Sequence, residues 1–280
     1  MRRVLIAGCG YVGSAAAKLF AQADWEVSGW TRTQGSSKRA IADATSIRAV
    51  DITDVDTVRR NCFEADLVVH CASAGSDSYR RVYRDGAANL VDCFPNARII
   101  FTSSTSVYGQ RDRSWVTEES ITEPLSENAK ILLEAENLVL AHKGIVLRVA
   151  GIYGPGRSFF LRSVIERTAP SGDRIVNQVH RDDVASAIFF LAQRDDITGP
   201  QIFNVIDNVP TSRSEILSWL ATRLNLPAPS LSGAIESKRG NSNKRVSNAK
   251  LRALGWAPRF PSYIEGFDFS VIPALAVSGA

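Results

Sequence analysis

Val4-Leu5-Ile6-Ala7 runs directly into Gly8-Cys9-Gly10-Tyr11-Val12-Gly13, and the alanine-rich stretch Ser14-Ala15-Ala16-Ala17-Lys18-Leu19-Phe20 follows. The apolar run is typical of a buried parallel strand. In this G-x-G-x-x-G spacing, Gly8 allows a tight turn, Gly10 lets the backbone approach a pyrophosphate, and Gly13 lets helix and strand pack closely. The free N–H groups at the helix start favour anionic phosphates. The stretch predicts a dinucleotide site that also includes Tyr11 and Val12, against the alternative of a glycine turn without a ligand.

Apolar strands alternate with helical stretches through the first half of the chain. We expect strands at 25–30, 46–50, 66–71, 97–101 and 145–148, and helices at 79–94 and 127–142. Such repeated units predict an α/β fold with a doubly wound parallel sheet, whose ligands bind beyond the carboxyl ends of the strands. We expect 1–150 to be the dinucleotide-binding core and 151–280 a small α/β substrate-side lobe, from which 175–206 contributes a helix and a strand to the core.

The composition is that of a globular protein in aqueous surroundings. Of 280 residues, 45% are hydrophobic and 22% charged, and the net charge of +4 is too small to indicate nucleic-acid binding. No apolar run approaches the roughly 18 residues of a membrane-spanning helix. The four cysteines lack CxxC spacing and the three histidines lie far apart, so we expect free thiols, a cytoplasmic location and no metal.

Polar or small residues follow several of the strands. Arg32 follows the second strand, where no carboxylate is present to hold the ribose 2′-hydroxyl of NAD. A guanidinium there suits a 2′-phosphate, so we expect NADP in preference to NAD, with a solvated arginine as the alternative. Asp51 and Ile52 follow the third strand and could contact adenine. Cys71-Ala72-Ser73 follow the fourth and could lie near the pyrophosphate and ribose, although both stretches also suit ordinary turns.

A hydroxyl-rich turn and a basic segment complete the candidate sites. Thr102-Ser103-Ser104-Thr105-Ser106 ends the fifth strand and could bind a carbonyl or anionic oxygen. The densest positive charge is Lys238-Arg239-Gly240-Asn241-Ser242-Asn243-Lys244-Arg245. This segment is either a solvated loop or a clamp for an anionic small-molecule substrate.

These segments together resemble the extended and atypical short-chain dehydrogenase/reductases, in the group of NAD-dependent epimerases and dehydratases. The resemblance is carried by the glycine motif and by the segments at 51–52, 71–75, 103–109, 147–156 and 180–185. The ending, 243–261, is similar to that of a compact bacterial subgroup. The resemblance implies a Rossmann fold, a bound NADP or NAD, and a homodimer formed through the helices at 79–94 and 127–142.

The same resemblance implies a catalytic set of serine, tyrosine and lysine. Ser104 falls on the serine position and Lys130 on the lysine position, where it would also hold the nicotinamide ribose. The tyrosine should lie one helical turn before the lysine, and Ser126 stands there. A serine hydroxyl cannot be brought to a working pKa as a tyrosine can, and Ser126 also suits the N-cap of the following helix. Tyr108 and Tyr153 are alternative acids.

Two functions follow from these residues. The first is an NAD(P)-dependent oxidoreductase, epimerase or dehydratase with an atypical active site, acting on a sugar-like or nucleotide-linked substrate. The second is an NADP-binding redox sensor or scaffold without turnover, which Ser126 favours. Neither hypothesis includes a nucleic acid or a membrane as a partner.

Overall fold

The computed structural model describes residues 1–33, 46–168, 172–229 and 242–278. It divides into two compact units. Unit 1 comprises 1–107, 126–149 and 184–203, and unit 2 comprises 108–125, 150–183 and 204–280. Residues 108–125 thus belong with unit 2, whereas the sequence pattern groups them with the first domain. Residues 184–203, from the second half of the chain, are grouped with unit 1.

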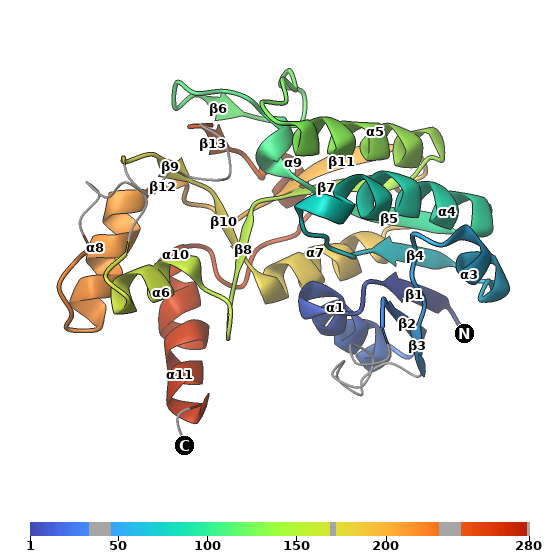
Figure 1. Ribbon diagram of the computed structural model, residues 1–280, viewed down its shortest axis with the longest axis horizontal. Coiled ribbons are helices and arrows are strands. Elements are labelled where there is room, and N and C mark those ends of the chain that lie inside the picture. Colours follow the sequence, from blue (N-terminus) through green and yellow to red (C-terminus); the bar gives the residue numbers. More distant parts are fainter. Residues whose placement is uncertain (34–45, 169–171, 230–241, 279–280) are drawn as a thin grey trace. The chain divides into compact units, whose positions relative to one another are not determined.

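Unit 1 is built on a parallel sheet, which has seven strands within the described residues, in the order β11-β7-β5-β4-β1-β2-β3 (Figure 1). The strands are β1 (Arg3–Ala7), β2 (Glu26–Thr31), β3 (Ser46–Ala49), β4 (Leu67–His70), β5 (Arg98–Ser104), β7 (Ile145–Val149) and β11 (Gln201–Val205). The order runs outward in both directions from β1, so the predicted doubly wound sheet is confirmed. Its switch point lies between β1 and β4, where ligands of such sheets bind.

Helices cover both faces of this sheet (Figure 1). They are α1 (Tyr11–Gln22), α3 (Val55–Arg60), α4 (Gly86–Cys93), α5 (Glu127–Ala141) and α7 (Arg181–Ala192), with short turns η1 (Ser76–Ser78) and η3 (Thr105–Val107). Helix α4 packs against both α3 and α5 on one face, and Phe20 of α1 meets Phe189 of α7 on the other. The helix expected at 79–94 is present, with a π-helical turn, η2 (Arg81–Asp85), just before α4.

Unit 2 combines short strand pairs with helices. The strands are β6 (Trp115–Val116), β8 (Gly151–Tyr153), β9 (Ile175–Val176), β10 (Gln178–His180), β12 (Thr211–Ser212) and β13 (Arg245–Val246). The helical elements are α6 (Phe159–Ile165), α8 (Arg213–Arg223), α9 (Ala249–Ala253), α10 (Tyr263–Gly266), η4 (Phe267–Val271) and α11 (Ile272–Ser278). Its apolar core joins α6, α8 and the C-terminal helices around Tyr153, Leu220 and Phe267.

Cysteine pairing differs from the sequence expectation. Cys62, just after α3, and Cys93, at the end of α4, are joined as a disulfide, while Cys9 and Cys71 are free. The expectation of free thiols is therefore wrong for Cys62 and Cys93, because folding brings together two residues 31 positions apart.

Two kinds of feature are absent from the described ranges. There, no helix is both long and apolar enough to span a membrane. In the same residues, no group of three or more His, Cys, Asp and Glu side chains could hold a metal ion.

Candidate functional site

The glycine turn lies at the carboxyl end of β1. The N–H groups of Gly8 and Cys9 both donate to the carbonyl of Trp30, at 3.0 and 2.9 Å, so the turn is fastened to the end of β2. Gly8 has a φ of +100°, a conformation that side-chain-bearing residues rarely adopt. A Cβ on Gly8 would also collide with the backbone of Cys71 and Ala72 after β4. The turn and the Cys71-Ala72-Ser73 stretch therefore lie together at the switch point.

The other two glycines have different surroundings. A Cβ on Gly13 would collide with the carbonyl oxygen of Gly8 and lie 2.9 Å from Cγ2 of Ile6, so Gly13 permits close packing of α1 on β1. A Cβ on Gly10 would meet no atom within 4 Å. Gly10 is the N-cap of α1, and no side chain caps the helix. Open space beside a helix start that no side chain caps is a fitting place for a pyrophosphate.

The ends of β2 and β3 form the adjoining part of this edge. The N–H of Val50 donates to the carbonyl of Thr31 at 2.8 Å, which brings Arg32 and Asp51 to the ends of neighbouring strands. Arg32 is exposed, and the half-buried Asp51 accepts a hydrogen bond from the N–H of Thr53 at 2.9 Å. The side chain of Ile52 is only 5% exposed, so little of it faces solvent where an adenine could contact it.

Two titratable groups beneath this edge have shifted pKa values. Burial lowers the pKa of His70, the last residue of β4, to about 4, and its Nε2 lies 3.0 Å from the carbonyl of Val82. Burial raises the pKa of the Cys71 thiol to about 12. At neutral pH His70 is therefore uncharged and Cys71 is protonated, so neither supplies a charge to a ligand or a thiolate nucleophile.

Each hydroxyl at the end of β5 has a different role. Thr102 donates to the carbonyl of His70 at 2.9 Å and ties β5 to β4. Ser103 donates to Oε1 of Glu136 at 2.6 Å. Oγ of Ser104 accepts a hydrogen bond from the N–H of Ser106 at 3.2 Å, so its own proton is left to donate to a substrate oxygen. Of these three hydroxyls, Ser104 is therefore the one best suited to that role.

A buried ion pair behind Ser104 escaped the sequence analysis. Glu136 of α5 and Arg148 of β7 are 1% and 4% exposed, and Nη2 of Arg148 lies 2.7 Å from Oε2 of Glu136. Together with Ser103 they join α5 to two central strands. The sequence could have indicated this pair, because Glu136 and Arg148 each stand as a charged residue among apolar neighbours, in α5 and in β7. Charged side chains are seldom fully buried without a partner.

The start of α5 carries Ser126 and Lys130. The hydroxyl of Ser126 accepts a hydrogen bond from the N–H of Ala129 at 3.3 Å, which confirms its expected place as the N-cap. Lys130 is exposed and pairs with Glu127 at 3.3 Å. Lys130 is not among the buried residues of α5, which are Ala129, Ile131, Leu132, Ala135, Glu136 and Val139, so it lies on the solvent-exposed side of the helix.

Tyr108 and Tyr153 are both committed to packing in unit 2. Tyr108 is fully buried, and its hydroxyl donates to Oδ1 of Asn204 at 2.9 Å. The hydroxyl of Tyr153 faces the carbonyl of Ser262 at 3.4 Å, and burial raises its pKa well above the usual range. A catalytic acid must reach its substrate, and both hydroxyls are buried and face partners within unit 2, so neither residue has the surroundings of a replacement acid.

The basic segment is only partly within the described residues, since 238–241 lie outside them. Lys244 is 4% exposed, and its Nζ donates to the carbonyl of Tyr108 at 2.8 Å. Burial, with Arg174 nearby, lowers the pKa of Lys244 to about 8. Both interpretations of the segment, a solvated loop and an anion clamp, are therefore wrong for Lys244, whose ammonium is buried and hydrogen-bonded inside unit 2.

The segment around His180 fixes the C-terminal part of unit 2. The carboxylate of Asp183 accepts hydrogen bonds from the N–H groups of Arg259 and Phe260, at 2.6 and 3.1 Å. His180 Nδ1 accepts from the N–H of Asp182 at 3.2 Å, so the ring proton lies on Nε2, which donates to Oγ of Ser270 at 2.9 Å. With its proton there, His180 cannot act as a base toward Ser270, and the grouping is structural.

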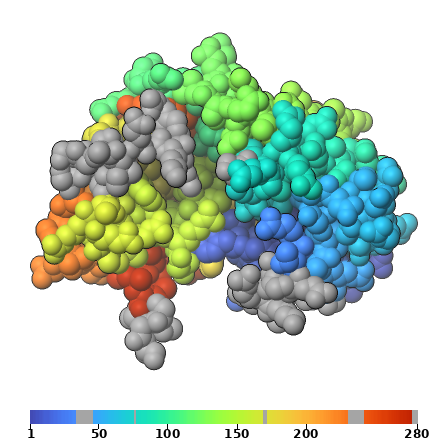
Figure 2. All heavy atoms as spheres, in the orientation of Figure 1, coloured from blue at the N-terminus to red at the C-terminus, as the bar shows by residue number. Residues whose placement is uncertain are grey.

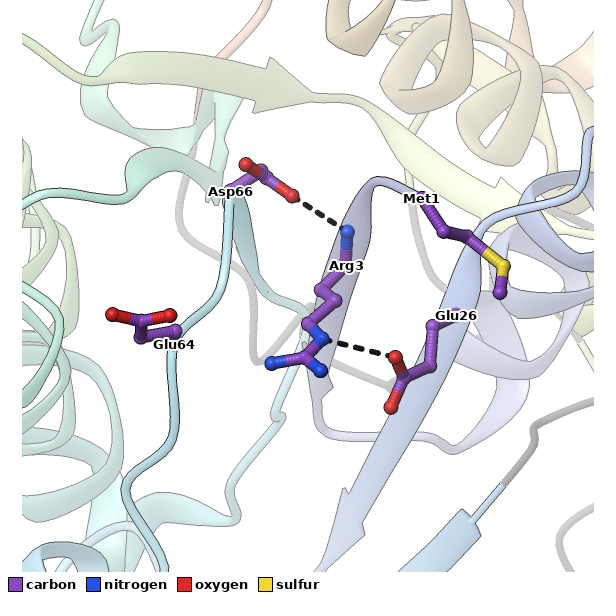
Figure 3. Close-up of a pocket in the computed structure, with 5 residues that line it drawn as sticks. All are labelled: Met1, Arg3, Glu26, Glu64 and Asp66. Atoms are coloured by element: carbon purple, nitrogen blue, oxygen red, sulfur yellow. Dashed lines mark hydrogen bonds and ion pairs between the residues drawn. The ribbon is translucent and has the colours of Figure 1, made fainter.

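A surface depression on unit 1 lies at the opposite edge of the sheet. It is lined by Met1, Arg3, Glu26, Glu64 and Asp66 (Figure 3). Arg3 is held by two of the other lining residues, with its Nε 2.9 Å from Glu26 and its backbone N–H donating to Asp66 at 2.7 Å. These residues lie at the amino ends of β1, β2 and β4, whereas ligands of doubly wound sheets bind at the carboxyl ends.

Comparison with known proteins agrees with this architecture. The NAD dependent epimerase/dehydratase family matches residues 4–205. Protein YeeZ of Escherichia coli K12 is 30% identical over 281 aligned residues, covering 93% of this chain and 97% of YeeZ.

Two solved structures share the fold. A candidate NAD-dependent epimerase/dehydratase from Methylobacillus flagellatus is 30% identical with a TM-score of 0.81, covering 100% of this chain and 99% of that one. UDP-glucose 4-epimerase from Thermus thermophilus, solved in complex with NAD, is 20% identical with a TM-score of 0.82, covering 98% and 99%. The family match and the relatives at 30% identity confirm the predicted superfamily, and the chain belongs to the NAD dependent epimerase/dehydratase family.

Proposed function

We propose that this protein binds NADP, or NAD, at the Gly8–Gly13 turn and acts as an oxidoreductase, epimerase or dehydratase on a small-molecule substrate of the sugar-nucleotide kind. The observation that carries the proposal is the open space at Gly10 beside the uncapped start of α1. The contact of this turn with Cys71 and Ala72, at the switch point of the sheet, supports it. A bound nicotinamide dinucleotide would supply hydride transfer.

Arg32 is proposed to select NADP. Its exposed guanidinium stands at the end of β2, where it can pair with an adenosine 2′-phosphate. We expect NADPH to bind at least about tenfold more tightly than NADH at low salt, a difference of roughly 1.4 kcal/mol. Arg32→Gln should remove most of this preference, as measured by fluorescence titration. Arg60→Gln, which removes the same charge from the end of α3, is the control. Tighter binding of NADH than of NADPH would contradict the assignment.

Ser104 is proposed to bind the substrate oxygen. Its hydroxyl proton is free to donate because Oγ is held as an acceptor by the N–H of Ser106. With any substrate found in a panel of UDP-sugars and simple carbonyl compounds, Ser104→Ala should lower kcat/KM by about 100-fold or more. NADPH affinity should stay unchanged. Ser106→Ala keeps the backbone donor and serves as the control. An unchanged kcat/KM in Ser104→Ala would contradict the proposed role of Ser104.

The second candidate function is an NADP-binding sensor or scaffold without turnover. It is favoured by Ser126, whose hydroxyl caps α5, and by Lys130, which pairs with Glu127 at the surface. In this case NADPH binds, no member of the substrate panel is converted, and the oxidised and reduced cofactors bind with different affinities. Equal affinities would remove the basis for sensing. We also infer a cytoplasmic homodimer from the family resemblance, which cell fractionation and analytical ultracentrifugation would test.

A further inference from the structure

Cys62 and Cys93 lie at neighbouring helix ends on the surface of unit 1. Cys62 follows α3 and is exposed, and Cys93 ends α4 and is half-buried. Helices α3 and α4 pack side by side there, in the blue and cyan region of Figure 2. The Cα atoms of the two cysteines are 6.2 Å apart. This separation lies within the range of roughly 4.4–6.8 Å that a disulfide spans without movement of the backbone.

The site also suits the reduced form of the pair. The carbonyl oxygen of Val58, in the last turn of α3, lies 3.5 Å from Sγ of Cys62 and 3.8 Å from Sγ of Cys93. After reduction, either thiol can donate to this carbonyl, so breaking the disulfide leaves a hydrogen-bond acceptor within reach of both thiols. Because Cys62 is exposed, a small oxidant or reductant can reach the pair from solvent.

The remaining two cysteines have other surroundings. Cys9 is buried, and burial raises the pKa values of both the Cys9 and the Cys71 thiols. Thiol–disulfide exchange requires a thiolate and access to its partner, so these two are poor reactants. They supply internal controls in the same chain.

We propose that Cys62 and Cys93 form a reversible redox pair that exchanges with small disulfides of the glutathione class and locks α3 to α4. The Cys62 thiolate attacks one sulfur of glutathione disulfide, whose S–S bond breaks, and one glutathione leaves as a thiol. The Cys93 thiolate then attacks the Cys62 sulfur and releases the second glutathione as a thiol. The protein loses two protons and two electrons, and glutathione disulfide gains both.

The Cys62–Cys93 disulfide lies in unit 1, which also carries the glycine turn. The bond closes a loop between residues 31 positions apart, which restricts the unfolded chain. Asn89 of α4 lies within this loop and donates to the carbonyl of Ile52, which precedes the loop, at 2.9 Å, and Ile52 also packs against Gly86 of the loop. The loop therefore packs against the segment that precedes α3, and tying its ends together stabilises this packing against unfolding.

To test this, the full chain is equilibrated in buffers with different ratios of reduced to oxidised glutathione and then quenched in acid. The free thiols are alkylated in denaturant, and the number of alkylated cysteines is determined from the intact mass. In the oxidising buffer we expect two alkylated residues, mapped to Cys9 and Cys71, and in the reducing buffer all four cysteines. Reduction should lower the thermal midpoint by about 5–10 °C. The double variant with Cys62→Ser and Cys93→Ser should show one midpoint in both buffers.

A single variant tests the order of exchange. Cys93→Ser should retain one glutathione on Cys62 after oxidation, because the resolving thiol is absent. Four alkylated cysteines in the oxidising buffer, a bond mapped to Cys9 or Cys71, or equal midpoints for the two redox forms would each overturn the proposal. No readout includes a nicotinamide cofactor, so this result and that of the proposed function are independent.

Discussion

Replacing Glu136 with alanine is expected to lower the free energy of unfolding by about 3–5 kcal/mol, among the largest effects of any single substitution in this chain. Arg148 is 4% exposed and would lose the carboxylate that lies 2.7 Å from its Nη2. Ser103 would lose its acceptor in the same step. A buried guanidinium without its anion cannot regain the solvation that it gave up on folding, and this cost dominates.

Urea denaturation followed by circular dichroism measures this loss, and the same helix supplies the control. Glu134, two residues earlier, pairs with Arg80 at 2.7 Å, but both side chains are nearly half exposed. Glu134→Ala should therefore cost less than about 1 kcal/mol. The double variant with Glu136→Leu and Arg148→Met should be far closer to wild type than Glu136→Ala alone, because no charge is left buried. Equal effects of Glu136→Ala and Glu134→Ala would show that the buried ion pair contributes no more to stability than the exposed one.

Substituting alanine at Gly8 and at Gly10 is expected to separate folding from cofactor binding. At Gly8 a Cβ meets the backbone of Cys71 and Ala72, and the φ of +100° is unfavourable for alanine. Backbone atoms cannot move aside as a flexible side chain can, so Gly8→Ala should destabilise the protein by about 2–5 kcal/mol and also abolish NADPH binding. At Gly10 a Cβ meets nothing within 4 Å, so Gly10→Ala should change stability by less than about 1 kcal/mol.

The effect at Gly10 should appear only when the cofactor is added. A methyl group there occupies the space proposed for the pyrophosphate, so NADPH affinity should fall about tenfold or more. Thermal unfolding and fluorescence titration of both variants give the two readouts. A Gly10→Ala protein that binds NADPH like wild type would place the pyrophosphate elsewhere, and a fully stable Gly8→Ala protein would contradict the turn geometry.

Local sequence determined those elements whose stabilising pattern lies within a few residues. The apolar runs at Val4–Ala7 and 145–148 needed only their own composition to be recognised as buried strands. The start of α5 followed from Ser126, since an N-cap bonds a backbone group three residues away. The G-x-G-x-x-G spacing likewise located the turn between β1 and α1, because glycine is required there by local backbone conformation.

The tertiary structure decided which side chains are available for chemistry, because that depends on residues far away in the chain. The hydroxyl of Tyr108 is taken by Asn204, 96 positions later, and the ammonium of Lys244 by the carbonyl of Tyr108. No local pattern indicates such partners, since hydrogen bonds and burial are set by the packing of distant segments. The sequence alone therefore determined where a dinucleotide is expected to bind. The folded chain added the physical reason to favour Ser104, because it showed that Thr102, Ser103 and the two tyrosines use their hydroxyls to hold the structure together.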